Sequence, residues 1–296
     1  MQKTQKESIF IGENKIYIHF FRIIVFLHYL CIMIEASHIA VIIILYHPSV
    51  DDMGFVTHIG ELYHTVVVDN SIENKGIAEA QNQGLQAILR QESTTHVVFL
   101  DQDSRVADDY PLAIAREFDR IAETQRLAML GPSVDNSETG EKYKSVIHKD
   151  QVTDIGFIPR REIISSGSCT TIECLREVGL NDSSLFIDYV DFEWCWRANS
   201  KGYVCGITPN LHISHHVGQK TISLFGYLII LSAPGRYFYQ FRNYLWLVRR
   251  KCVPLQWKIA TGVKFAARLV YFPLCIPSGA ACWKNMLKGI LAGLKT

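Results

Sequence analysis

The run IAVIIIL, residues Ile39 to Leu45, constrains the fold of this chain more than any other feature. Consecutive apolar and mostly β-branched residues suit a strand that is buried on both faces. The following Tyr46-His47-Pro48 would end that strand, because proline has no N–H to contribute to a sheet. Strands buried on both faces occur in parallel sheets covered by helices. The run therefore predicts a central parallel strand of an α/β domain.

Strands and helices are expected to alternate after this first strand, since short apolar runs alternate with segments whose apolar residues recur at helical spacing. Glycine residues mark the ends of the last two helices. The expected elements are strands over Thr65 to Val68, Thr95 to Leu100 and Leu127 to Leu130, the last ended by Gly131-Pro132, and helices over Ile77 to Leu89, Leu112 to Thr124, Thr171 to Val178 and Asp191 to Lys201.

Charge is divided unevenly along the chain. The formal net charge is +1, yet the last acidic residue is Glu193, and 14 lysines and arginines follow it. Apolar runs such as Tyr227 to Leu231 interleave with this charge, which favours an anionic membrane surface over nucleic acid as partner. The residues expected to contact the inner face of the membrane are Arg249, Arg250, Lys251 and Lys258, with Trp246 and Trp257 beside them.

The amino-terminal segment fits none of these patterns. Phe20 to Ile34 is apolar but short for a membrane span, and Arg22 interrupts it. As a signal peptide it would have a poor cleavage site at Glu35-Ala36-Ser37, and a true start at Met33 is the third reading. The eight cysteines form no C-x-x-C pair, which is typical of reduced thiols in a cytoplasmic protein. We expect an extension over residues 1–37, an α/β domain over 38–220 and a basic, mostly helical region over 221–296.

The segment FLDQDS, Phe99 to Ser104, is the first candidate for chemistry. A strand would deliver Asp101 and Asp103 to a cleft, where carboxylate oxygens can hold Mg²⁺ or Mn²⁺ against a diphosphate. Open α/β sheets bind ligands beyond the carboxyl ends of their strands, so Asp69 to Ser71 should face the same cleft. Two acidic residues can also serve only to keep a loop solvated, which leaves the metal site open on spacing alone.

Three further segments carry candidate residues. Asn74 and Gly76 precede a helix whose amino end can hold an anion such as a nucleotide phosphate, or they simply cap it. Asp191 lies among aromatic residues in LFIDYVDFEWCWRA, where burial would raise its pKa toward that of a general base, although it could be the N-cap of the next helix. Finally, His215 in LHISHHVG can complete a metal site begun by carboxylates, or lie on the surface as adjacent histidines usually do.

These motifs, in their order along the chain, resemble glycosyltransferase family 2. The segments are VVVDNS, NKGIAEAQNQG, FLDQDS, SSGS, LFIDYVDFEWCWRA, HHVG and RYFYQFRNYLWLVRR. FLDQDS and FIDYVDFEW are similar to the rhamnosyltransferase subgroup, and the resemblance covers His38 to about Arg250. It implies a GT-A fold, an inverting reaction and a dTDP-L-rhamnose donor. Subgroups that use UDP-galactofuranose or a UDP-hexose share much of the pattern and form the alternative.

The resemblance also implies roles for single residues. Asp191 matches the family's catalytic base and His215 its metal ligand. The first strand ends in Leu45-Tyr46 where relatives often have Thr-Tyr, and the extension before His38 has no counterpart. The implied binding residues are Tyr46, His47 and Asp69 for the nucleotide, Asp101 and Asp103 for the ribose and metal, and Ser166, Gly167 and Ser168 for the acceptor or a phosphate.

The expected function is therefore transfer of L-rhamnose to a saccharide or lipid-linked saccharide in bacterial surface polysaccharide synthesis. The enzyme would be cytoplasmic and peripherally attached to the inner face of the cell membrane. A dehydrogenase of Rossmann type would require G-x-G-x-x-G after the first strand, and YHPSVDD contains no glycine. A nonenzymatic membrane-binding protein is favoured only by the basic carboxyl-terminal region.

Overall fold

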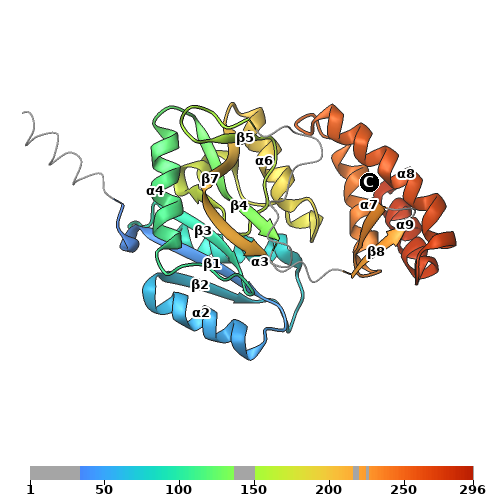
Figure 1. Cartoon of the computed structure of the whole chain (residues 1–296), viewed down its shortest axis with the longest axis horizontal. Helices are drawn as coiled ribbons and strands as arrows, with labels where there is room; N and C mark the ends of the chain where they lie inside the picture. Colours follow the sequence, from blue (N-terminus) through green and yellow to red (C-terminus); the bar gives the residue numbers. More distant parts are fainter. Residues whose placement is uncertain (1–33, 137–150, 216–219, 225–226, 296) are drawn as a thin grey trace, which may run out of the picture. The chain divides into compact units, whose positions relative to one another are not determined.

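The computed structural model describes residues 34–136, 151–215, 220–224 and 227–295 (Figure 1). The chain divides into two units, residues 1–35 and 36–296, and the description below concerns the second. Most of the expected extension, including Met33, lies outside the described residues.

A seven-stranded sheet with the order β2-β1-β3-β6-β4-β7-β5 forms the centre of this unit (Figure 1). Strand β1 (Ile39–Leu45) lies between β2 (His64–Asp69) and β3 (His96–Asp101) and runs parallel to both. Six of its seven residues are buried. The predicted central parallel strand is confirmed at the predicted residues.

The sheet is mixed rather than wholly parallel. Strand β6 (Cys169–Thr171) lies antiparallel between β3 and β4 (Leu127–Asn136), and β5 (Ile158–Arg160) is antiparallel to β7 (Val204–His215). The prediction that β4 ends at Gly131-Pro132 is wrong, because the strand continues past both residues. Its pairing with β7 shifts immediately after Pro132, and this irregularity accommodates a residue that has no N–H to donate.

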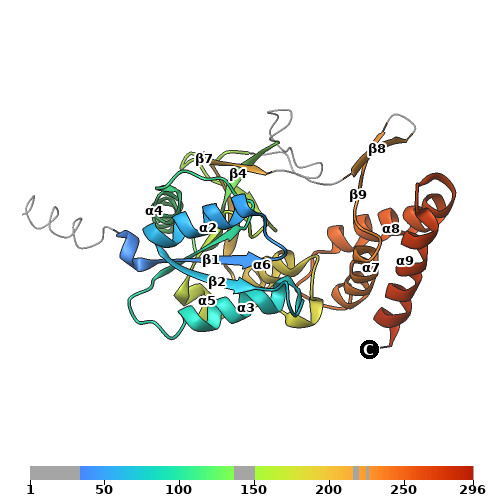
Figure 2. The ribbon, with the colours of Figure 1, turned by 90° about the horizontal axis from the view of Figure 1, so that it is seen from below.

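Helices cover both faces of the sheet. Figure 2 shows α2 (Val50–Leu62) and α4 (Tyr110–Ala122) on one side of the first strands and α3 (Gly76–Ile88) on the other. The sequence analysis missed α2, although Ser49 and Asp52 form a capping box at its start: each side chain accepts a hydrogen bond from the other residue's backbone N–H.

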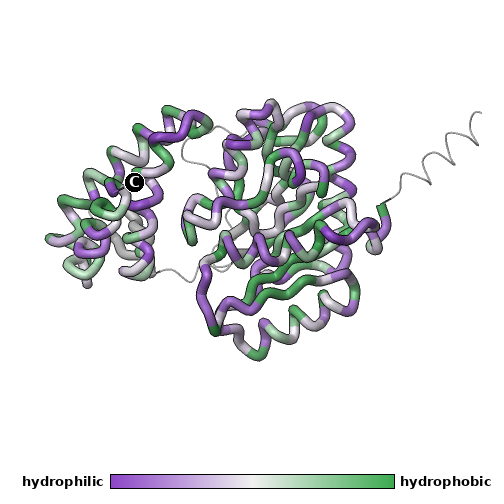
Figure 3. Tube along the Cα trace, turned by 180° about the vertical axis from the view of Figure 1, so that it is seen from behind, coloured by the Kyte–Doolittle hydropathy of each residue, from purple (hydrophilic) through white to green (hydrophobic). Residues whose placement is uncertain are grey.

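Two shorter helices follow β6 near their predicted positions. Helix α5 (Ile172–Val178) ends at Gly179, whose φ of 91° favours glycine, and α6 (Val190–Ser200) ends shortly before Gly202, with φ 82°. Hydrophobic residues concentrate along the central strands that these helices cover (Figure 3). The fold thus places α6 directly before β7, with its amino end toward the candidate site.

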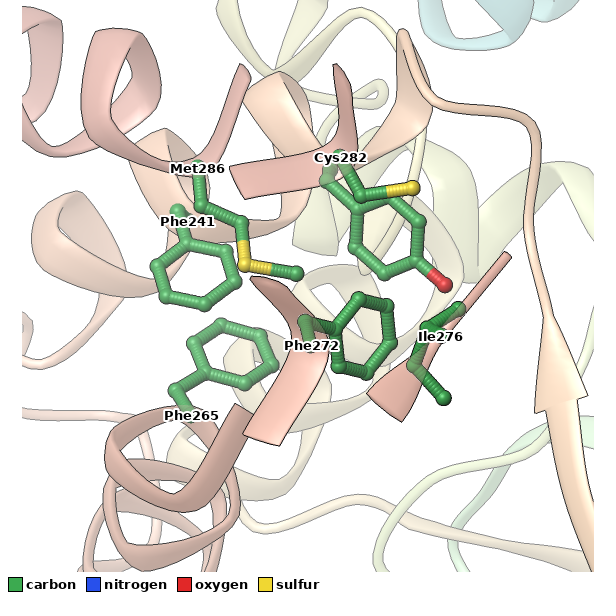
Figure 4. Close-up of a cluster of buried hydrophobic side chains, with 7 residues drawn as sticks. Phe241, Phe265, Phe272, Ile276, Cys282 and Met286 are labelled. Carbon is green, nitrogen blue, oxygen red and sulfur yellow. The ribbon is translucent and has the colours of Figure 1, made fainter. Parts of the chain in front are cut away.

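The carboxyl-terminal region begins with a hairpin of β8 (Lys220–Leu224) and β9 (Tyr227–Leu231). Three helices follow, α7 (Arg236–Leu247), α8 (Leu255–Cys275) and α9 (Gly279–Leu294), as expected for a mostly helical appendage. Their buried core is drawn in Figure 4; its labelled residues are Phe241, Phe265, Phe272, Ile276, Cys282 and Met286.

Close packing of α7 on α9 depends on Gly289. A Cβ at this position would lie 2.4 Å from the carbonyl oxygen of Phe238. The rings of Phe241 and Phe265 stack in the same core with their centroids 4.2 Å apart.

None of the helices that the structure describes has the length and hydrophobicity needed to cross a membrane.

Candidate active site

The loops after β1, β2 and β3 meet at one edge of the sheet. The backbone N–H of Tyr46 donates to Oε1 of Gln102 at 2.6 Å, and Nε2 of Gln102 donates to the carbonyl oxygen of Tyr46 at 3.3 Å. The N–H of His47 donates to Oγ of Ser71 at 2.8 Å. The structure therefore brings together the two polar segments that the sequence analysis assigned to one cleft.

The three residues expected at the nucleotide are open to solvent on this edge. Tyr46 is half exposed, and its ring lies 4.5 Å, centroid to centroid, from the ring of His47. Asp69 is exposed, and the hydrogen bonds from Ser71 to its carboxylate lower its pKa, so it is anionic at neutral pH. A ligand can reach all three side chains without displacing a buried group.

Asp101 and Asp103 occupy a tight turn at the end of β3. The hydroxyl of buried Ser104 accepts from the N–H of Asp101 at 3.0 Å, and the N–H of Ser104 donates to the carbonyl oxygen of Asp101 at 3.0 Å. Asp101 is partly buried, whereas Asp103 is exposed. Hard oxygen donors of this kind suit Mg²⁺ or Mn²⁺.

The third expected metal ligand, His215, is the last residue of β7, and its side chain lies outside what the structure describes. His216 is likewise outside the described residues. The nearby His212 is exposed, and its Nε2 is 3.0 Å from the carbonyl oxygen of Pro209. Within the described side chains, no three His, Cys, Asp or Glu residues gather into a metal cluster.

Asn74 and Gly76 shape the entry to α3. Oδ1 of Asn74 accepts from the N–H of Gly76 at 3.0 Å. Gly76 has φ 83°, and a Cβ there would lie 2.4 Å from the carbonyl oxygen of Phe186. The N–H of Ala78 also donates to this oxygen, at 3.3 Å. Glycine is thus required where α3 touches the segment that leads to Asp191.

The serine-rich turn before β6 lies against the end of β3. Gly167 has φ 72°, its N–H donates to the carbonyl oxygen of Phe99 at 2.7 Å, and its own carbonyl accepts from the Tyr110 hydroxyl at 2.6 Å. The Oγ of Ser168 donates to the carbonyl oxygen of Ser165 at 2.7 Å. The Oγ of Ser166 is buried and has no hydrogen-bond partner among the described groups, so a ligand oxygen would reach it only after the turn moves.

Asp191 lies in the first turn of α6, partly buried. Its Oδ2 accepts from the N–H of Ser165 at 3.2 Å, and its Oδ1 accepts from the N–H of Phe192 at 3.0 Å. Burial raises the pKa of Asp191 to about 6, with a further contribution from the negative charge of Asp101, against the opposing effect of the backbone hydrogen bonds. The N-cap of α6 is Tyr189, not Asp191, so the N-cap interpretation is wrong.

The neighbouring carboxylates are neutralised by arginines. Asp188 receives two hydrogen bonds from Arg236, at 2.7 and 3.2 Å. Buried Glu193 pairs with Arg197 at 3.0 Å and with Arg250 at 2.9 Å. In the described part of the chain, Asp191 accepts hydrogen bonds from backbone N–H groups alone, whereas Asp188 and Glu193 are paired with arginines. It is the carboxylate best suited to take a proton.

Three residues before Asp191 adopt left-handed backbone conformations: Phe186 at φ 65°, Asp188 at 67° and Tyr189 at 66°. Such conformations are costly for residues with side chains and persist only where the surroundings enforce them. The segment from Phe186 to Tyr189 is called the strained loop below. It delivers the chain into α6 and so sets the position of Asp191.

Helix α7 holds this loop. Asn243 is fully buried, and its Nδ2 lies 2.9, 2.8 and 3.1 Å from the carbonyl oxygens of Leu185, Ile187 and Asp188. The ring of Tyr239 stacks on Phe186 with centroids 4.5 Å apart. The sequence analysis did not assign a role to these α7 residues, although Arg236, Tyr239 and Asn243 recur at the spacing of one helical face, which was the available signal.

A pocket of about 400 Å³ opens beside Asp191. Its lining is mostly apolar, with Ser165, Gln81, Asp188 and Arg236 as polar members. This volume lies within the range of small-molecule sites. A proton acceptor with a raised pKa, a few polar groups in the pocket and the charge of Asp101 close enough to act on Asp191 together suit transfer of a group between two polar molecules.

Comparisons with known proteins agree with this geometry. The dTDP-rhamnosyl transferase RfbF of Shigella flexneri is 31% identical in an alignment 289 residues long, and the alignment covers 87% of this chain and 95% of that protein. The structure of S. aureus TarS, a GT-A glycosyltransferase, matches with a TM-score of 0.50 at 12% identity, over 87% of this chain and 81% of that chain. A likeness at that identity shows the fold, here the GT-A fold.

A structure of GalNAc-T7 with UDP, GalNAc and Mn²⁺ matches with a TM-score of 0.47 at 14% identity, over 70% of this chain and 51% of that chain. No protein-family model matches the chain.

Proposed function

This chain belongs to the rhamnosyltransferase-like glycosyltransferases of family 2, and from that premise we propose that it transfers L-rhamnose from dTDP-L-rhamnose to a saccharide acceptor with inversion. The observation that carries the proposal is the state of Asp191. Its carboxylate lines a pocket and has a pKa raised to about 6. In the described structure it forms no ion pair with an arginine, unlike Asp188 and Glu193, although the charge of Arg236 acts on it at longer range.

In the proposed reaction, Asp191 accepts the proton of an acceptor hydroxyl as that oxygen attacks the anomeric carbon. The bond from this carbon to the nucleoside diphosphate breaks, and the diphosphate leaves with the electron pair. Attack from the face opposite the leaving group inverts the configuration, so no covalent sugar intermediate is needed. Ser165 and Phe192 hold the carboxylate in place through their backbone N–H groups.

The donor would lie along the strand-end edge. Tyr46, His47 and Asp69 would contact the nucleoside, and the turn that carries the buried Ser166 would contact a phosphate or acceptor oxygen. Asp101 and Asp103 fit Mg²⁺ or Mn²⁺, which bind through one or two carboxylates together with substrate phosphates. When bound, the ion would neutralise charge on the departing diphosphate.

The acceptor is proposed to be a saccharide or lipid-linked saccharide presented at the anionic inner face of the membrane. Support comes from the 14 basic residues after Glu193. Of the four basic residues expected at the membrane, two are already engaged inside the protein. Arg250 pairs with Glu193 and Asp182, and Arg249 donates to the carbonyl oxygen of Gly293 at 3.0 Å, so both act within the protein.

The two tryptophans expected beside these cations also make internal contacts. Trp257 packs on Trp196 with centroids 4.8 Å apart, and the guanidinium of Arg242 lies 4.3 Å from the ring of Trp246. Lys251 and Lys258 line an open pocket. Nζ of Lys258 also donates to the carbonyl oxygen of Arg250 at 2.8 Å, whereas Lys251 is exposed, so Lys251 is the better candidate for a lipid phosphate.

The test is release of dTDP from dTDP-L-rhamnose, with UDP-galactofuranose and UDP-hexoses as competing donors. We expect dTDP-L-rhamnose with Mg²⁺ or Mn²⁺ to raise the melting temperature most, because only ligands that bind the folded state do so. A UDP-sugar that gave the larger shift and the faster turnover would replace the donor. Absence of turnover with every donor would favour the nonenzymatic membrane-binding alternative.

A separate variant tests whether Asp103 binds the metal ion. Asp103→Ala should abolish the response of turnover to added Mg²⁺ or Mn²⁺ while leaving the melting temperature of the free enzyme unchanged, since Asp103 is exposed and packs no core. Asp109→Ala, which changes another exposed aspartate after the same turn, is the control. An unchanged metal response in Asp103→Ala would overturn the assignment.

A further inference from the structure

Helix α8 has an exposed apolar face. Leu255, Ile259, Val263, Val270 and Leu274 recur at intervals of four and seven residues, and each is between 59% and 80% exposed. At 3.6 residues per turn they fall within an arc of about 100°. The stripe is about 29 Å long at 1.5 Å per residue. These five side chains are called the α8 stripe.

The other side of α8 is already occupied. Phe265 and Phe272 are buried in the helical core, against Phe241 and Tyr237 of α7 (Figure 4). A helix on the surface of a globular protein normally carries one apolar stripe, the one that packs on the core. The second stripe of α8 is a continuous exposed apolar surface, the kind that marks an interaction site.

Positive charge adjoins one end of the stripe. A pocket of about 540 Å³ is lined by Leu255 of the stripe together with Arg161, Lys251 and Lys258, and no acidic residue lines it. Nor does any acidic residue follow Glu193 in the sequence. The fitting partner is thus apolar along about 29 Å and anionic beside Leu255. A leaflet of acidic lipids has both properties, since its phosphates lie above its acyl chains.

We propose that α8 lies in the plane of an anionic membrane surface, with the α8 stripe among the upper acyl chains and the exposed Arg161 and Lys251 on lipid phosphates. This inference rests on the membrane association proposed above and names the surface that makes it. Because the Phe265 face packs on protein, α8 contacts lipid along one side only.

The attachment lies close to the candidate base. Trp257, in the first turn of α8, contacts Trp196 of the basic pocket and also Tyr189 of the strained loop, with centroids 4.8 and 5.2 Å away. Trp257 projects from the side of α8 that faces away from the stripe, so the width of α8 and one layer of aromatic side chains separate a membrane held by the stripe from the segment that positions Asp191. A lipid-linked acceptor would have a short path to the pocket.

The experiment measures binding of the full chain to vesicles of phosphatidylglycerol mixed with phosphatidylcholine. The test variant carries Ile259→Gln and Val263→Gln in the α8 stripe. The control carries Val50→Gln and Leu62→Gln, the same kind of change at exposed positions of α2. All of these side chains are exposed, so the melting temperature should not fall. Release of dTDP from soluble donor is measured in parallel.

We expect the test variant to lose at least about tenfold in its vesicle partition constant and the control to match the wild type. Donor hydrolysis should be unchanged in both. A test variant that binds vesicles as the wild type does would overturn the inference while leaving membrane association standing. A wild type that binds no vesicles would refute membrane association itself, without touching the transferase activity.

A second copy of this chain is the competing occupant of the α8 stripe. Light scattering distinguishes it: a dimer that Ile259→Gln with Val263→Gln converts to a monomer, without loss of vesicle binding, would assign the stripe to self-association and overturn the membrane assignment. A monomer in solution whose vesicle binding depends on the stripe supports it.

Discussion

The two sides of the candidate site are held in different ways. On the donor side, Tyr46 and Asp103 lie on exposed loops directly after parallel strands, and Asp69 is the exposed last residue of another. The loops are joined by hydrogen bonds to one another. On the base side, Asp191 is partly buried, and the loop before it is held by Asn243, which lies 55 to 58 positions from the carbonyls it contacts.

The difference reflects what each side must do before substrate arrives. A nucleotide and a metal ion carry their own charges, so the donor-side residues can remain exposed to solvent until the ligand binds. A general base must have its pKa and position set in advance. Burial and a loop with three left-handed residues do this for Asp191, and α7 supplies the hydrogen bonds that make the strained conformation persist.

The largest effect is expected from Asp191→Asn. The amide keeps the size of the side chain and can still accept a hydrogen bond from Ser165, but it cannot take a proton, so transfer should fall by about 10²-fold or more. Donor affinity, a property of the other side, should be retained in calorimetry with dTDP-L-rhamnose.

Transfer near the wild-type rate in Asp191→Asn would move the base to Asp188 or Glu193. Glu193→Gln is the matched comparison: it removes a carboxylate that is paired with Arg197 and Arg250, so it should lower the melting temperature more than it lowers transfer in the remaining folded protein.

Asn243→Ala should come next, with kcat lowered about tenfold to thirtyfold and the donor KM nearly unchanged. Removal of the side chain leaves the carbonyls of Ile187 and Asp188 without the donor described for them, whereas that of Leu185 still accepts from Arg242. Each unsatisfied buried acceptor costs about 1–3 kcal/mol, so the strained loop should relax. Kinetics are measured well below the lowered melting temperature.

Asn285→Ala is the control for Asn243→Ala, because among the described residues the Nδ2 of Asn285 bonds to the carbonyl of Ala281, one turn earlier in α9, at an exposed position. If kcat in Asn243→Ala equalled that of the control, α7 would support the fold but not the position of the base.

The length of each element decided whether it could be predicted from the sequence. Strand β1, its parallel neighbours and the helices from α3 to α6 have apolar patterns long enough to show their period, and they lie close to the expected residues. Strands β5 and β6, with three residues each, are too short to show one. The chain between Leu127 and Asn136 reads as a shorter strand because Pro132 normally ends one.

In the site, topology predicted the donor side, since the ends of parallel strands must share an edge. The hydrogen bonds from Asn243 to the strained loop join segments that are far apart in the chain, so the sequence around Asn243 does not predict its partners. Asp191 itself was identified through the motif around it, while the reason for choosing it over Asp188 and Glu193 came only from the arginines that the fold places beside those two.

The pH dependence of kcat/KM should reveal the raised pKa of Asp191. Burial raises the pKa of Asp191 to about 6, so the carboxylate is ionised above pH 6 and protonated below it. Because the base must be unprotonated, kcat/KM should be level above pH 7 and fall about tenfold by pH 5, with a slope of one. The profile is measured with circular dichroism as a check on folding. An acid limb near pH 4, the ordinary range of an aspartate, would show that burial does not tune Asp191.

The smallest effect is expected on the donor side, from Gln102→Ala. Its side chain joins the loop after β3 to the backbone of Tyr46 through two hydrogen bonds on an exposed edge. Their loss should let Tyr46 move more freely, which raises the donor KM about threefold to fivefold at nearly constant kcat, because exposed hydrogen bonds contribute about 1 kcal/mol. Gln91→Ala, which removes a contact with His64 at 2.9 Å, is the control. A fall in kcat with the donor KM unchanged would mean that the strand-end edge also positions the reacting groups, and the division between an open donor side and a preset base side would not hold.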